Sequence, residues 1–334
     1  MPASSTTRSE YANMKQRFLS LSLAAVASTS LLVGTSLAQA DYPDKPINLV
    51  VGYSAGGGTD VMARTVAKYL EEQLGDGATV VVKNMPGAGG QIGFSALASA
   101  SPDGYTIGTM NLPAALALTY DREADYDVDS FTWLANFVSD PNTLVVPKDS
   151  DIASVEDLIA YARDVQGKMP VGLSSLGGND HFSAIQFAEA ADIELNYVPF
   201  NGAAQARSAL MGGHVAMGTM AYSQTVGFED ELRVLAVLAD ERLEQATNVP
   251  TAKELGFDIE MGSFRGLAAP ANLPVDIRSV LLGALEDVAE DINFSSDMAQ
   301  QGNPLSVIYG EDYRALAEAR DELTRRTWEE TPWK

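Results

Sequence analysis

Two kinds of apolar and polar pattern alternate along most of the chain. Short apolar runs such as Ile47-Asn48-Leu49-Val50-Val51 predict buried strands. Between them, apolar residues recur every three or four positions, as from about Thr59 to Gln73, which predicts amphipathic helices. Turns such as Pro102-Asp103-Gly104 separate the two. This order predicts βαβ units and a parallel sheet.

A second series of such units follows Asp140-Pro141-Asn142. Ser154, with Asp157 three residues later, has the spacing of a helix N-cap. Two amphipathic helices are predicted to finish the chain, the first with an apolar stripe that runs from Ile277 to Ile292. The later strands are predicted at 171–175, 195–200, 214–219, 233–238 and 264–269.

The N-terminal region has the pattern of a secretory signal peptide. Lys15 and Arg17 precede an apolar, serine-rich run from Phe18 to Leu37, and Ala38-Gln39-Ala40 follows as a cleavage signal. An uncleaved membrane anchor is the alternative, since about 20 apolar residues can span a bilayer. We expect residues 1–40 to be removed after about Ala40, which places the mature protein in the periplasm.

Composition excludes several classes of function. A net charge of −23 argues against a nucleic acid partner, which needs basic patches. The chain has no cysteine and only two histidines, so we expect no disulfide, no metal site and no cofactor. The acidity fits a solvated surface, and a cation scavenger is an alternative suggested by charge alone.

The mature chain is expected to be a monomer of about 290 residues, a natural size for two lobes.

One motif predicts catalysis. Gly52-x-Ser54-x-Gly56 lies between a strand and a helix, like the nucleophile elbow of serine hydrolases. Against this, Ser54 follows the first strand of the mature chain, and the two histidines lie in the middle of the chain rather than after its last strand. We therefore expect no enzyme, with a secreted serine esterase that uses Ser54 as the alternative function.

Two glycine-rich turns predict an anion site. Gly56-Gly57-Gly58-Thr59-Asp60 and Gly177-Gly178-Asn179-Asp180-His181 each precede or open a helix. Unpaired backbone N–H groups and the positive end of the helix dipole attract anions at such positions, and glycine lets a ligand approach the main chain. Two such turns in separate βα units favour an anion held between two lobes.

Several motifs follow one another in a fixed order along residues 42 to 334. They are Tyr42-Pro43-Asp44-Lys45-Pro46-Ile47, Gly56-Gly57-Gly58-Thr59-Asp60, Pro86-Gly87-Ala88-Gly89-Gly90, Pro102-Asp103-Gly104-Tyr105-Thr106, Val198-Pro199-Phe200-Asn201-Gly202, Met211-Gly212-Gly213-His214-Val215, Asn248-Val249-Pro250-Thr251 and Gly266-Leu267-Ala268-Ala269-Pro270. In these motifs the chain resembles the Bug family, the extracytoplasmic substrate-binding proteins of tripartite tricarboxylate transporters.

This resemblance implies a fold and a function. The fold would be α/β, of the type II periplasmic-binding-protein kind, with two lobes and a ligand cleft between them. One lobe would comprise 42–141 and 268–334, and the other 142–267. The protein would capture a small organic carboxylate, with a di- or tricarboxylate favoured, and deliver it to membrane permease subunits. It would need no cofactor.

The resemblance also implies the ligand-binding residues. Ala55, Phe200 and Asn201 depart from the residues usual in the family, as do Ala216 and Met220, where aspartate is frequent. The loss of aspartate argues against an amino acid ligand. Arg265 is predicted to hold a second carboxylate, distal to the one at the Gly57 turn. The candidate ligand-binding residues are Tyr53, Ser54, Ala55, Gly57, Gly58, Thr59, Asp60, Ser174, Ser175, Gly177, Gly178, Asn179, His181, Phe200, Asn201, Gly202, Met220, Phe264 and Arg265.

Overall fold

The structure is a computed structural model that describes residues 42–75, 77–122, 124–200 and 202–333. The chain divides into two units, Met1–Asp44 and Lys45–Lys334, and only Tyr42 to Asp44 of the first are described. The predicted signal peptide and its cleavage site therefore lie outside the described residues. Within the described ranges, no helix is both long enough and apolar enough to cross a membrane.

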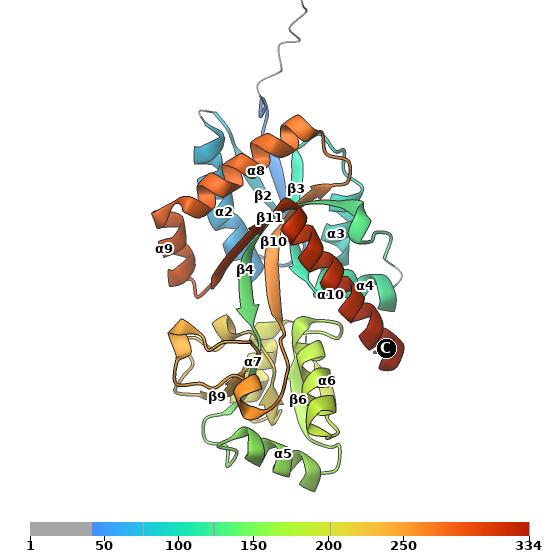
Figure 1. The fold of residues 1–334 in the computed structure, drawn as a ribbon, viewed down its shortest axis with the longest axis vertical. Coiled ribbons are helices and arrows are strands. Elements are labelled where there is room, and N and C mark those ends of the chain that lie inside the picture. Colours follow the sequence, from blue (N-terminus) through green and yellow to red (C-terminus); the bar gives the residue numbers. More distant parts are fainter. Residues whose placement is uncertain (1–41, 76, 123, 201, 334) are drawn as a thin grey trace, which may run out of the picture. The chain divides into compact units, whose positions relative to one another are not determined.

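The first of two sheets has six strands (Figure 1). In spatial order they are β11 (Leu305–Tyr309), β4 (Phe131–Pro141), β10 (Gly262–Pro270), β3 (Thr106–Leu112), β1 (Ile47–Val51) and β2 (Val80–Asn84). β1 is parallel to β2 and β3, which confirms the predicted βαβ units. β10 is antiparallel to β3 and β4. β3 and β10 lie in the middle of the sheet and are buried almost throughout.

Helices cover both faces of this sheet. In chain order they are α2 (Gly58–Leu74), α3 (Gln91–Ala98), α4 (Ala114–Asp121), α8 (Val275–Glu290), α9 (Ile292–Gln300) and α10 (Gly310–Glu330). Figure 1 shows α2, α8 and α9 on one side of the sheet, with α3, α4 and α10 on the other. α2 buries Met62, Val66 and Leu70, four residues apart on one stripe, because that spacing places them on the same face of a helix.

The second sheet has five strands. In spatial order they are β7 (Asn196–Pro199), β6 (Pro170–Leu173), β8 (Met217–Gly218), β5 (Thr143–Pro147) and β9 (Leu232–Val237). Its helices are α5 (Val155–Asp164), α6 (Asn179–Ala191) and α7 (Ala203–Met211). The predicted cap of α5 is confirmed, since the amide of Asp157 donates to Ser154 Oγ at 3.1 Å. We call the first sheet with its helices lobe 1 and the second sheet with its helices lobe 2.

Short 3₁₀ turns complete the described elements. They are η1 (Ala88–Gly90), η2 (Val128–Ser130), η3 (Tyr222–Gln224), η4 (Glu244–Ala246) and η5 (Lys253–Leu255).

The end of the chain differs from the prediction of two helices, which is wrong. Three helices, α8, α9 and α10, and the strand β11 follow β10. Asp291 ends α8 and starts α9, because its carboxylate accepts hydrogen bonds from the amides of Asn293 (2.7 Å) and Phe294 (3.4 Å). Ile292, which the predicted stripe places on the buried face, is 78% exposed as a result.

The chain passes between the two sheets at two adjacent strands. β4 ends at Pro141 and β5 begins two residues later, which is where the predicted boundary between 141 and 142 falls. On the return, Gly262 of β10 pairs with Pro141, and Ser263 pairs with Asp140. The predicted boundary between 267 and 268 falls inside β10, so by sheet membership the return to lobe 1 is complete at Gly262.

Side chains from lobe 1 contribute to the core of lobe 2. The largest buried cluster of lobe 2 is built on β5, β6 and α6, with Leu144, Leu173 and Phe187 among its members. Two further members come from elsewhere: Ala117 from α4, and Trp333 from the segment after α10. Burial of this apolar surface therefore holds the two lobes together as well as stabilising lobe 2.

A buried ion pair joins the two crossing strands. Arg265 Nη2 lies 2.6 Å from Asp140 Oδ2, and the two residues are 3% and 0% exposed. Asp140 also accepts hydrogen bonds from Ser223 in lobe 2, from the hydroxyl at 2.5 Å and the amide at 3.1 Å. Asn303, between α9 and β11, accepts a hydrogen bond from Arg265 Nη1 at 2.9 Å. One carboxylate and one guanidinium thus link β4, β10, lobe 2 and the α9–β11 turn.

Asp140→Asn should lower the free energy of unfolding by about 3 kcal/mol, because it leaves the Arg265 charge buried without a counterion. Asp240→Asn is the matched control, since Asp240 pairs with Lys253 at an exposed site where salt bridges contribute little. Urea denaturation would measure both variants. Equal losses would show that the buried pair does not stabilise the crossing.

Candidate functional site

The first glycine turn joins β1 to α2 and is largely exposed. Residues 54–58 are exposed, and Tyr53 is half-buried, in edge-to-face contact with Phe94. Gly57 is the N-cap of α2, with φ −81° and ψ 164°, and it offers no side chain to cap the helix. The first N–H groups of a helix have no partner within the helix, so this turn presents backbone donors that a ligand can reach.

Asp60 holds this turn in place. Its carboxylate accepts hydrogen bonds from the amide of Gly56 (2.8 Å), from Arg64 Nε (3.0 Å) and from Asn84 Nδ2 (2.8 Å). Burial acts to raise the pKa of Asp60, but these hydrogen bonds outweigh it and hold that pKa below its usual value. Asp60, a predicted ligand contact, is thus 2% exposed and bonded to the turn itself, which is the position of a supporting residue.

The second turn, between β6 and α6, has a similar construction. Asp180 is 4% exposed, and its carboxylate accepts hydrogen bonds from the amides of Ser174 and His181. Gly178, the N-cap of α6, has φ −85° and ψ 170° and again offers no side-chain cap. Burial raises the pKa of Asp180, and its bonds to these backbone amides lower it only in part. In both turns, an aspartate in the first turn of the helix accepts a hydrogen bond from a backbone amide that precedes the helix.

The buried ring of His181 holds the backbone of the second turn. Its Nδ1 accepts the Gly177 N–H at 3.1 Å, which leaves the ring proton on Nε2. The ring is 2% exposed and makes aromatic contacts with Tyr197, Phe182 and Trp333. Burial lowers the pKa of His181 to about 4, so the ring is neutral at physiological pH. It therefore contributes an acceptor for the main chain rather than a positive charge for an anion.

The third predicted segment lies against the second turn. The Gly202 N–H donates to the Ser174 carbonyl at 3.0 Å, and the Phe200 N–H donates to the Leu173 carbonyl at 2.8 Å. Phe200 is half-buried. Asn201 lies outside the described residues. The structure thus brings Ser174, Phe200 and Gly202 together at the end of β6, as the prediction requires.

Met220 and Phe264 are buried instead of exposed to a ligand. Met220 is 4% exposed within a hydrophobic cluster of lobe 2 that includes Val145 and Leu210. Phe264 is 7% exposed in the core of lobe 1, and the Arg320 guanidinium lies 4.5 Å above its ring. Both side chains therefore pack inside the protein and are not exposed to a ligand.

The side chain of Arg265 lies beside the first turn. A Cβ atom added to Gly58 would lie 3.1 Å from Arg265 Nη1. Burial raises the pKa of Tyr53, and the positive charge of Arg265 lowers it in part, which places the two side chains near each other. Asp140, Asn303 and Ser263 accept three of the five guanidinium N–H groups. Most of the hydrogen-bonding capacity of Arg265 is therefore directed to the protein.

Sequence reasoning misses Asn111 and Asp140. Asn111 pairs with Arg265 across β3 and β10, and its Nδ2 donates to Thr59 Oγ1 at 2.8 Å. Asn111 Oδ1 is buried and has no hydrogen-bond partner among the described residues. An asparagine inside a buried strand is a signal that could have identified it, because buried polar groups normally have partners. Asp140 has a weaker signal, since its position before Pro141 resembles a turn.

Ser54 has no catalytic partner in the described chain. It is exposed, and none of the hydrogen bonds of the described residues joins it to a histidine. The Nδ1 of His181 is already bonded to Gly177, and His214 is an exposed residue after α7. A nucleophilic serine needs a base within hydrogen-bond reach, so the geometry does not support the esterase alternative.

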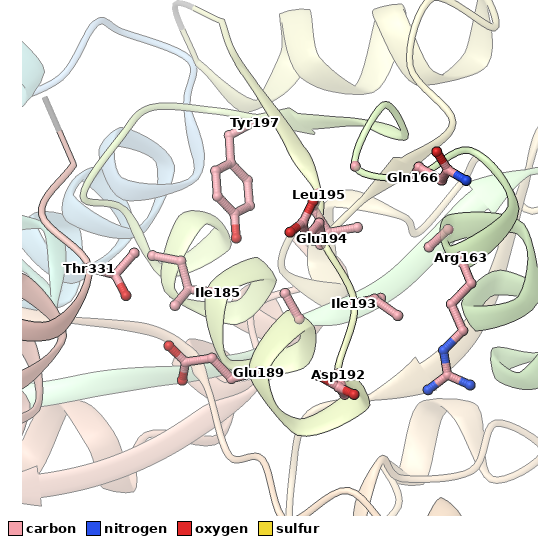
Figure 2. Close-up of a pocket in the computed structure, with 13 residues that line it drawn as sticks. Arg163, Gln166, Ile185, Glu189, Asp192, Ile193, Glu194, Leu195, Tyr197 and Thr331 are labelled. Atoms are coloured by element: carbon pink, nitrogen blue, oxygen red, sulfur yellow. The ribbon is translucent and has the colours of Figure 1, made fainter.

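A surface pocket of about 670 Å³ lies elsewhere in lobe 2 (Figure 2). Its lining comes from α5, α6, β7 and the turns before β6 and β7, with Thr331 from the segment after α10, and includes none of the predicted ligand-binding residues. Three carboxylates, Glu189, Asp192 and Glu194, lie around it, and Arg163 donates to the Ala191 carbonyl instead of pairing with them. An acidic pocket does not suit a carboxylate, so the glycine turns are the better candidate for the site.

Comparison with known proteins identifies the family. Residues 62–327 match the TctC family, described as "Tripartite tricarboxylate transporter family receptor". The chain belongs to this family. A Cupriavidus necator relative, "UPF0065 protein in gbd 5'region", is 33% identical over 281 residues, which cover 83% of this chain and 85% of that protein.

Solved structures of related proteins agree with this assignment. The periplasmic binding protein BugD is 27% identical with a TM-score of 0.76, covering 86% of this chain and 98% of BugD. An R. palustris protein solved with adipate is also 27% identical, with a TM-score of 0.77, covering 86% of this chain and 97% of that one. The fold is thus α/β and of the type II periplasmic-binding-protein kind, and this TctC protein is a solute-binding receptor of a transporter.

The low pKa of His181 predicts acid sensitivity. The unfolded chain protonates this residue near pH 6.5 and the folded protein only near pH 4, so the stability it contributes is complete above pH 6.5 and is lost as the pH falls toward 4. The loss should reach about 3 kcal/mol relative to His181→Asn, whose amide oxygen can still accept the Gly177 N–H. Urea denaturation at several pH values would measure it.

Two comparisons control this measurement. His214→Gln, at the exposed histidine, should keep the pH dependence of the wild type. The raised pKa of Asp180 acts in the opposite direction but is present in every variant, so it cancels in the difference. Parallel curves for the wild type and His181→Asn would contradict the assignment.

Proposed function

We propose that this receptor captures a small organic carboxylate in a cleft between the glycine turns of its two lobes and delivers it to permease subunits in the membrane. The observation that carries the proposal is the shared construction of the two turns. Each places a glycine N-cap before a helix, without a side-chain cap, and each is held by a first-turn aspartate. Helix starts of this kind bind carboxylates through backbone N–H groups and the helix dipole.

The charges around the site fit a carboxylate bound by backbone groups. Asp60 is balanced by Arg64, and Asp140 is balanced by Arg265. Burial raises the pKa of Asp180, and its carboxylate is bonded to the backbone amides of Ser174 and His181. Thr59 Oγ1 accepts a hydrogen bond from Asn111, so its own hydroxyl hydrogen can still be donated to a ligand.

A dicarboxylate is the ligand class that we favour. The adipate in the R. palustris relative is a dicarboxylate, and that protein covers most of this chain. Arg265 lies next to the Gly58 backbone and keeps two guanidinium N–H groups that Asp140, Asn303 and Ser263 do not use, which supports a contact with a second carboxylate. We keep Arg265 as a proposed ligand contact on this ground.

We also propose that the protein is exported and has no catalytic activity. The signal-peptide pattern of residues 1–40 and the periplasmic BugD support export, with cleavage after about Ala40. The separation of Ser54 from both histidines supports the absence of catalysis. Ester hydrolysis that disappears in Ser54→Ala would contradict this proposal.

A thermal-shift panel tests the ligand class directly. Dicarboxylates, tricarboxylates, monocarboxylates, amino acids and polyamines would each be added to the mature protein. A ligand that binds only the folded state raises the Tm in proportion to the logarithm of its concentration above the Kd. We expect adipate or another dicarboxylate to give the largest shift. A response to polyamines alone would favour the cation-binding alternative.

Gly57→Val should abolish most carboxylate binding without unfolding the protein. The extended backbone of Gly57 suits valine, and an added Cβ would meet only the Ser54 carbonyl, at 3.7 Å. The side chain would instead occupy the approach to the helix amides. Gly283→Ala, at a position in α8 with nothing within 4 Å, is the control and should bind normally.

Thr59→Val should weaken binding by about 1.5–3 kcal/mol, the range for a hydrogen bond to a charged group, whereas Thr59→Ser keeps the hydroxyl and should bind like the wild type. Calorimetry on folded protein would measure each affinity. Unchanged binding in both Gly57→Val and Thr59→Val would move the site away from this turn.

A further inference from the structure

The last described residue of the chain, Trp333, lies against the second glycine turn. It is 5% exposed, although it follows the final helix. Its ring centroid lies 4.9 Å from that of Phe182, 6.0 Å from His181 and 4.8 Å from Trp328, each in edge-to-face geometry. Phe182 and His181 both belong to the first turn of α6, so the indole packs on the base of the ligand-binding turn.

Gly177 shows how close this packing is. A Cβ atom added there would lie 3.0 Å from Trp333 Nε1 and 3.3 Å from Ala117 Cβ. Gly177 also has φ +73°, a conformation that other residues rarely adopt. Its N–H donates to His181 Nδ1, and the His181 ring contacts Trp333 in turn. The backbone at Gly177 is therefore enclosed by the indole, the imidazole and the α4 methyl group.

The elements that carry these contacts belong to lobe 1. Trp333 follows α10, which packs on β4 and α4. Tyr120 of α4 donates to Asp321 of α10 at 2.9 Å, which fixes the two helices to each other. Ala117 and Trp333 thus present one surface of lobe 1 to a turn of lobe 2.

Ring packing provides the contact that Trp333 makes with the turn. Its Nε1 is buried, and its N–H group faces the carboxyl of Asp121 in α4, where it lowers the pKa of Asp121 in part against the effect of burial. That polar contact lies within lobe 1, so the interaction with the turn itself is the packing of the rings. A phenyl ring should therefore replace the indole in part, and an alanine should not.

We propose that Trp333 is a positioning residue for carboxylate binding: its indole holds the Gly177 backbone so that the amides at the start of α6 face the ligand. This inference rests on the proposed function. It means that a residue that does not touch the ligand affects how well the site binds it. The ligand-binding turn of lobe 2 would then have its conformation set by lobe 1.

The first test needs no ligand. Hydrogen exchange of a peptide that covers residues 176–182 should be at least tenfold faster in Trp333→Ala and within threefold of the wild type in Trp333→Phe. Phe257→Ala is the matched control, because Phe257 contacts Phe187 in the same buried cluster of lobe 2 but does not touch the turn. Equal exchange in Trp333→Ala and Phe257→Ala would overturn the proposal.

The second test measures adipate affinity by calorimetry on the same proteins. Trp333→Ala should bind at least tenfold more weakly than Phe257→Ala, and Trp333→Phe should recover most of the affinity. If Trp333→Ala binds adipate like the wild type although its turn exchanges faster, the positioning role is refuted. If the wild type binds no member of the carboxylate panel, the proposed function is refuted instead, and exchange alone decides whether Trp333 fixes the turn.

A double variant provides the decisive measurement if Trp333→Ala does not fold. Gly177→Ala adds the methyl group that the indole excludes, so it should speed exchange of the turn. Trp333→Leu removes the atoms that crowd this methyl group. In the double variant Gly177→Ala/Trp333→Leu, exchange of the turn should be slower than the sum of the two single effects predicts. Additive effects would show that the two residues act independently and would overturn the proposal.

Discussion

The ion pair between Asp140 and Arg265 is the interaction on which the arrangement of this receptor depends. The chain passes between its two sheets at β4 and β10, and the pair joins these strands where they separate from lobe 2. Ser223 and Asn303 complete the coordination from either side, so neither charge is left without a partner after its removal from water. Arg265 also lies beside Gly58, so one guanidinium contacts both the first glycine turn and the junction between the sheets.

This arrangement explains how a strongly acidic protein can attract an anion. The charged side chains near the first turn are paired within the protein, Asp60 with Arg64 and Asp140 with Arg265. In the site that we propose, a carboxylate is attracted by the backbone N–H groups at the two helix starts, whose direction is fixed by the fold. Recognition by backbone groups depends on the shape of the ligand more than on the net charge of the protein. The acidic surface has little effect on it, because salt screens charges that lie far from the site.

The sequence predicts the repeated βαβ order, both glycine turns and the family, because each depends on local patterns. The other components depend on contacts between distant residues. Asp60 and His181 are predicted as ligand contacts, yet their side chains accept hydrogen bonds from the backbone of the turns. Sequence spacing does not show whether a side chain points toward a ligand or back toward its own turn. β4 is missed because it is buried on both faces and shows no alternation. The ionic partner of Arg265 is missed because Asp140 is distant in sequence and becomes a neighbour only when β4 and β10 pair.

The core of lobe 2 also has a consequence for the order in which the chain can fold. Its buried cluster includes side chains from α4, from β5 to Met261, and from Trp333 near the end of the chain. A chain that emerges with its N-terminus first cannot complete this cluster until almost every residue has emerged. Contacts between such distant residues form slowly, because the loops that they close are long. For the export that we propose, this delay is an advantage, since a chain that stays incompletely folded during synthesis remains able to pass through a translocation channel.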